Sequence, residues 1–96
     1  MTEKEVERKL VCMIAKHGGY CLKWVCPGWL GVPDRIILLP RGRVIFAELK
    51  RPQGGRIGKP QKIWRDRLAR LGFDHYFVQC DADIMLIETR LIREGY

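Results

Sequence analysis

The sequence predicts a single α/β domain whose elements follow the order α-β-β-β-α-β-α. Its 96 residues are enough for one domain, and 47% of them are hydrophobic, which is enough for a core. Segments with apolar residues at helical spacing alternate with short runs rich in Val, Ile, Leu and aromatic residues. No repeat or linker interrupts them, so we expect residues 1–96 to form one folding unit.

The first helix is predicted to begin at a capping box formed by Thr2 and Glu5. Apolar residues follow at helical spacing until Gly18-Gly19 ends the helix. Tyr20 to Val25 is predicted as a strand. Two prolines and two glycines make residues 26–33 a loop.

A hairpin comes next, with strands predicted over Arg35–Leu39 and Arg43–Lys50. Pro40 suits the first position of a type I turn, and Gly42 suits the left-handed position that follows such a turn. These residues indicate a three-residue loop, which pairs the last residue of the first strand with the first residue of the second.

This register brings charged side chains together. Asp34 falls opposite Glu48, and Lys50 shares a face with Glu48 because strand residues i and i+2 point the same way. A two-residue loop would place Asp34 opposite Leu49 and separate the three. Asp34 and Glu48 offer the oxygen ligands that Mg²⁺ or Mn²⁺ prefers, with the Leu49 carbonyl as a further ligand. We therefore predict a site for phosphodiester hydrolysis, in which Lys50 orients a water or neutralises charge on the phosphate. The alternative is an ordinary hairpin that ends in a solvated Glu/Lys pair.

The C-terminal half continues with a glycine-rich loop over Arg51–Lys59, whose composition suggests a segment that orders on a ligand. Pro60 is predicted to open a helix that Gly72 closes, and a strand follows over Phe73–Cys80. Asp81 is the predicted N-cap of a last helix; a strand over 84–88 is the alternative.

Two further polar residues are candidates for the site. Gln61, at the start of the second helix, either reaches the phosphate or its attacking water, or merely caps the helix. Glu7, on the first helix, either reaches the same metal through water or belongs to a solvated helix face.

The net charge of +7 favours a polyanionic partner. Eight of the 18 basic residues lie between positions 50 and 70, so we expect nucleic acid to bind there through its phosphates. Trp29, in the Gly/Pro loop, is expected to meet a base or a partner subunit, or else to be buried locally. The residues predicted to bind DNA are Arg51, Arg56, Lys59, Lys62 and Arg65.

The four cysteines, at positions 12, 21, 26 and 80, lack the spacing of a zinc site, which indicates free thiols in a reducing compartment. A zinc-stabilised interaction domain stays an alternative. The sequence shows no signal peptide and no apolar run that could cross a membrane. These features favour a location in the cytoplasm, and the family resemblance described below implies that the cell is bacterial or phage-infected.

Taken together, these residues resemble the VRR-Nuc family, the virus-type replication-repair nucleases of the PD-(D/E)xK superfamily. The resemblance spans nearly the whole chain and consists of Glu7, Gly31-Val-Pro-Asp34, Phe46-Ala-Glu48-Leu-Lys50 and Gln61, in the family's order. It implies a restriction-endonuclease-like core with a mixed central sheet flanked by helices. It also implies metal binding by Asp34, Glu48 and the Leu49 carbonyl, a catalytic Lys50, and supporting roles for Gln61 and Glu7.

The resemblance further implies a homodimeric Mg²⁺- or Mn²⁺-dependent endonuclease acting on branched DNA, such as four-way (Holliday) junctions, during DNA repair. The last helix has more apolar residues than one buried stripe requires. The additional residues either face a partner subunit or are buried within the monomer; they are Met85, Leu86 and Ile92. The alternatives are a nuclease for flaps or other DNA ends, and a non-catalytic basic module that binds nucleic acid.

Overall fold

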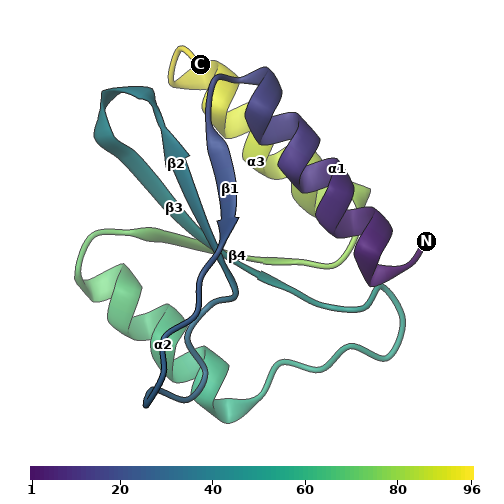
Figure 1. Ribbon diagram of the computed structural model, residues 1–96, viewed down its shortest axis with the longest axis vertical. Coiled ribbons are helices and arrows are strands. Elements are labelled where there is room, and N and C mark those ends of the chain that lie inside the picture. The colour runs from purple at the N-terminus through teal and green to yellow at the C-terminus, as the bar shows by residue number, and fades with distance from the viewer.

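The computed structural model describes residues 1–96, and Figure 1 shows a central sheet with helices on both of its faces. The elements are α1 (Glu3–Lys16), β1 (Tyr20–Lys23), β2 (Arg35–Leu39), β3 (Arg43–Leu49), α2 (Lys59–Arg70), β4 (Asp74–Val78) and α3 (Asp81–Arg93). The predicted α/β class and the element order are therefore confirmed. None of the three helices is long and apolar enough to cross a membrane.

The four strands form one mixed sheet in the order β1-β2-β3-β4. The first two pairs are antiparallel, and β3 and β4 are parallel because α2 carries the chain back between them. Leu39 pairs with Arg43 and Ile36 with Phe46, as the three-residue loop predicted.

The turn between β2 and β3 has the predicted length but not the predicted type. Gly42 is left-handed as expected, with φ of 71°, but Arg41 is left-handed too, with φ of 64°. Its guanidinium lies 4.2 Å from the centre of the Tyr96 ring and donates to the Glu94 carbonyl oxygen. These contacts with the C-terminus favour a backbone conformation that the type I turn would exclude.

Several element boundaries also differ from the prediction. β1 ends at Lys23, and the next residue, Trp24, packs its ring 5.0 Å from that of Phe46. α2 begins one residue before Pro60. The α3 N-cap is Cys80 rather than Asp81. Because α3 covers residues 84–88, the alternative strand there is wrong.

Successive β3 residues point to opposite faces of the sheet. One face packs against α1 and α3, which lie side by side in Figure 1 and form most of the aliphatic core with the strands. The other face carries α2 and a smaller aromatic layer in which Phe46 lies 5.4 Å from Phe73. Glu48 and Lys50 are on the same face as Phe46, so the candidate site lies beside α2.

Candidate functional site

Asp34 and Glu48 are joined by two reciprocal hydrogen bonds. The Asp34 backbone N–H donates to Glu48 Oε1 at 3.0 Å, and Asp34 Oδ1 accepts from the Leu49 backbone N–H at 3.1 Å. Asp34 lies just before β2, outside the strand ladder, but continues the predicted register. The second Asp34 carboxylate oxygen makes no hydrogen bond within the protein and is available to a ligand.

Gln61 connects the other members of the site. Its Nε2 donates to Glu48 Oε2, and its Oε1 accepts from Lys50 Nζ at 2.8 Å. The same Oε1 accepts the Gly58 backbone N–H at 2.7 Å, at the N-terminus of α2. Gln61 therefore caps the helix and also contacts Glu48 and Lys50, while its predicted contact with the phosphate or the attacking water stays a prediction.

The electrostatics of the site leave negative charge incompletely balanced. Burial raises the pKa of Asp34, although the Leu49 N–H opposes that shift. Burial also raises the pKa of Glu48, and the nearby Asp34 charge raises it further while Lys50 lowers it. Lys50 Nζ is 3.6 Å from Glu48 Oε2, and the positive charge of Arg35 lowers the pKa of Asp34, but the two carboxylates still repel each other. A divalent cation would relieve this repulsion.

A close backbone contact holds the site together. Gly31 has φ of +85°, and a Cβ built there would lie 2.5 Å from the Pro60 carbonyl carbon. Only glycine fits this approach of the 26–33 loop to the first turn of α2. Gly31 is three residues before Asp34, and Pro60 is next to Gln61, so the contact brings the two halves of the site together.

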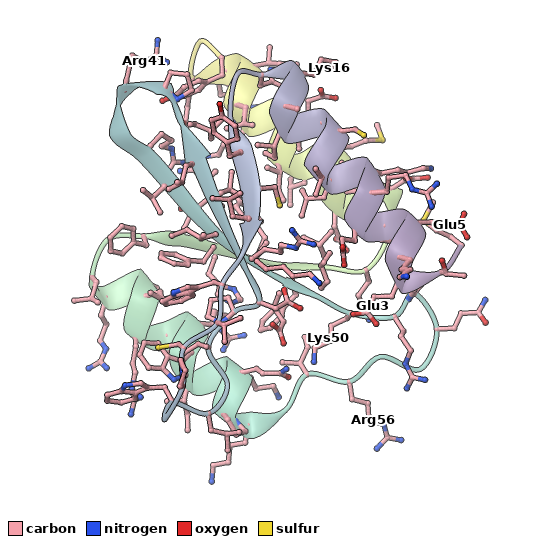
Figure 2. All side chains as sticks on the ribbon, in the orientation of Figure 1. Glu3, Glu5, Lys16, Arg41, Lys50 and Arg56 are labelled. Carbon is pink, nitrogen blue, oxygen red and sulfur yellow. The ribbon has the colours of Figure 1, made fainter.

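A cavity of about 440 Å³ opens beside Lys50. In Figure 2, Lys50 and Glu3 lie near each other, and Arg56 extends from the 51–58 loop. Glu3 also raises the pKa of Asp34. The sequence prediction missed Glu3, because an acidic residue in the first turn of a helix is common. The cavity is lined by Glu3, Leu49, Lys50, Arg51, Gly54, Gly55 and Arg56.

Glu7 is not part of this group. Its Oε1 lies 2.6 Å from Arg35 Nη2, and Arg35 also donates to the Cys21 carbonyl oxygen at 3.1 Å. Arg35 is 7% exposed and faces α1, on the opposite side of the sheet from α2. Glu7 thus neutralises a buried arginine, a contact that the spacing of residues on one helix could not reveal.

The basic residues predicted to bind DNA occupy different positions. Arg51 and Arg56 line the cavity, while Lys59 and Lys62 are exposed on the first turn of α2. Arg65 is half-buried and pairs with Asp66 at 3.0 Å. The first four therefore surround the site, and Arg65 lies farther along the helix.

The cysteines do not converge, and no group of three or more His, Cys, Asp or Glu side chains is placed to hold a metal ion. The zinc-stabilised alternative therefore has no ligand set in this fold. Asp34 and Glu48 are two carboxylates, which can hold Mg²⁺ when waters and phosphate oxygens complete its coordination.

Comparisons with known proteins indicate the family and the general activity. No protein-family model matches the chain. The chain is 48% identical over 80 residues to Putative nuclease p44 of Acyrthosiphon pisum secondary endosymbiont phage 1, covering 83% of each protein. It also superposes on a solved structure described as a VRR_NUC domain with a TM-score of 0.81 and 24% identity, covering 98% of this chain and 97% of the other. The chain belongs to the VRR-Nuc family of nucleases.

Proposed function

We propose that the protein is a Mg²⁺- or Mn²⁺-dependent endodeoxyribonuclease that acts as a homodimer on branched DNA, in particular four-way (Holliday) junctions. The observation that carries the proposal is the hydrogen-bonded group of Asp34, Glu48, Lys50 and Gln61 beside a cavity lined by arginines. The phage relative supports action in the cytoplasm of a bacterial or phage-infected cell.

The donor set fits a hard divalent cation. Asp34 and Glu48 supply carboxylates, and the Leu49 carbonyl is the proposed third ligand. The N–H and C=O of one strand residue point to the same edge, and the Leu49 N–H faces Asp34, which supports this assignment. When bound, Mg²⁺ or Mn²⁺ supplies Lewis-acid stabilisation of the phosphate and a more acidic water.

Lys50 then has a defined role at the scissile phosphate. Gln61 Oε1 holds its ammonium at 2.8 Å, which fixes the charge before DNA arrives. A preorganised cation stabilises the negative charge that grows on the phosphate oxygens in the transition state. Glu7 pairs with Arg35, so the supporting role that we propose for it acts through the position of Asp34, the residue next to Arg35.

The DNA backbone would enter over the 51–58 loop and the start of α2. Arg51 and Arg56 line the cavity, and Lys59 and Lys62 continue the positive surface. Arg65 extends it farther along α2. Such contacts fix the position of the duplex without reading its sequence, as a structure-specific enzyme requires.

The homodimer is supported by an exposed apolar surface on α3. Met85, Leu86 and Ile92 are 65%, 61% and 61% exposed, so they are not buried within the monomer. A two-fold dimer would present two equivalent sites, as symmetric incision of a four-way junction needs. Sedimentation at twice the monomer mass, lost in Leu86→Glu, would support this arrangement; a monomeric wild type that cuts junctions would contradict it.

Cleavage of labelled junction, flap, nicked, single-stranded and duplex DNA with Mn²⁺ tests the function. We expect the junction to be cut most rapidly, and EDTA or Asp34→Ala to abolish cleavage. Lys50→Ala should lose turnover while keeping much of the DNA affinity. Faster cutting of flaps or ends would identify those structures, rather than the junction, as the preferred substrate. Full affinity in EDTA with no cleavage of any DNA would favour the non-catalytic module.

A further inference from the structure

A second hollow, of about 510 Å³, lies along α2 beyond the candidate site. It is called the tryptophan hollow here and is lined by Trp29, Trp64, Arg67, Arg70 and Leu71. The two indole rings are 5.7 Å apart at 85°, and the Arg67 guanidinium lies 5.1 Å from the centre of the Trp64 ring. Trp29 is 59% exposed, so most of its surface is open to a ligand.

The charge of the tryptophan hollow is unbalanced. Arg65 pairs with Asp66, but neither Arg67 nor Arg70 forms an ion pair within the protein. Aromatic rings beside free guanidinium groups match a nucleotide, because the ring stacks on the base and the cation contacts the phosphate.

The tryptophan hollow also has a fixed position relative to the candidate site. Arg67 is six residues after Gln61, about 9 Å along the helix axis. That length corresponds to about two to three nucleotides of one strand. Trp29 comes from the same loop as Gly31, whose contact with Pro60 holds that loop on α2. The hollow and the site therefore keep a fixed separation.

We propose that the tryptophan hollow binds an unpaired base of the DNA, a few nucleotides from the scissile phosphate and next to the branch point. The proposal rests on the nuclease function above. A four-way junction has fully paired arms, so it would supply this base by the opening of one pair at the branch point. A second copy of the chain fits less well, since a two-fold contact at this patch would bring arginines against arginines.

The test uses splayed DNA with 2-aminopurine at successive unpaired positions, in EDTA so that no strand is cut. We expect fluorescence quenching at a position near the branch, and its loss in Trp29→Ala with about 5- to 100-fold weaker binding. Trp29→Phe should keep the quenching, because it keeps a ring. Tyr20→Ala is the matched control, since Tyr20 is an aromatic residue 70% exposed on β1, outside the hollow.

Wild-type binding and quenching in Trp29→Ala would overturn the proposal, as would a change of oligomeric state with DNA affinity unchanged. A second readout is the KM for splayed DNA with Mn²⁺, which Trp29→Ala should raise at least several-fold more than the KM for fully paired nicked DNA. Because the binding assay needs no cleavage, failure of the nuclease function and failure of this proposal are separately visible.

Discussion

The two faces of the sheet differ in the side chains that cover them. The face under α1 and α3 is closed by fourteen buried residues that form one cluster. α1 contributes four buried side chains and α3 three, whereas α2, on the other face, contributes only Leu68. The α2 face has only a smaller aromatic layer and, beside it, polar side chains that hydrogen-bond one another.

This difference separates stability from function. Burial of apolar area between α1, α3 and the sheet supplies most of the stability. α2 depends more on the Gly31–Pro60 contact and on Gln61, and these also position the site. Changes on the α2 face should therefore reduce activity first, and changes on the α1/α3 face should reduce stability first.

The largest effect is expected from Glu48→Gln. Loss of a charged ligand should lower the cleavage rate by about 10³-fold or more. Stability without metal should change little. Loss of the charge removes the unfavourable burial that raises the pKa of Glu48, but the new amide NH2 would face the donor Asp34 N–H or Gln61 Nε2. Rate assays with Mn²⁺ and urea unfolding in EDTA measure both; wild-type cleavage would remove Glu48 from the mechanism.

On the opposite face, Ile87→Ala should cost about 2–5 kcal/mol of unfolding free energy. Ile87 is fully buried in the cluster under α3, so its removal leaves a cavity. Urea unfolding gives the loss, and the cleavage rate per folded molecule should stay near that of the wild type. A large loss of turnover in the folded protein would show that the two faces are coupled.

Gln61→Ala should affect both properties. Loss of the acceptor for the Gly58 N–H should cost about 1 kcal/mol, and release of Lys50 should lower turnover by about 10²-fold. Thr2→Ala is the matched control, because it removes a capping box on α1 whose hydrogen bonds join only Thr2 and Glu5. It should cost similar stability without the loss of turnover; equal turnover in the two variants would leave Gln61 as a cap only.

Glu7→Gln should lower stability by about 1–3 kcal/mol, because it leaves the buried Arg35 guanidinium without its carboxylate. We expect a smaller effect on turnover than on stability. Thermal unfolding and single-turnover rates of the same preparation distinguish the two. A drop in turnover at unchanged stability would support the direct role that the family resemblance implies.

The smallest effect concerns pH and lies on the α1/α3 face. His17 Nδ1 is 3.0 Å from the Tyr96 carbonyl oxygen and Nε2 is 2.7 Å from Glu88 Oε2, contacts that raise the pKa of His17. The folded state therefore binds this proton more tightly than the unfolded state. The stabilisation that protonated His17 contributes to the folded state is complete below pH 6.5, roughly the ordinary pKa. It is lost as pH rises through the raised pKa. Urea unfolding from pH 5 to 9 measures how the free energy of unfolding depends on pH, and this dependence should be weaker in His17→Gln. An unchanged dependence would exclude the His17 contacts as its cause.

Much of the fold could be predicted because its signals are local. Thr2 and Glu5 formed the predicted capping box, and the three residues from Pro40 to Gly42 set the register that brings Asp34 beside Glu48. Gln61 could also be predicted as a candidate site residue, because it follows Pro60 at the start of a helix. The conformation of Arg41 was not, because contacts with Tyr96 and Glu94 decide it.

The sequence by itself determined the element order, the hairpin register and the convergence of Asp34, Glu48 and Lys50, because turn length and the two-residue period of a strand act over a few residues. Only the tertiary structure decided which glutamate of α1 lines the cavity, that Gln61 both caps α2 and holds Lys50, and that Gly31 packs on Pro60. Those outcomes depend on how α1 and α2 pack on opposite faces of the sheet, and no short stretch of sequence encodes that arrangement.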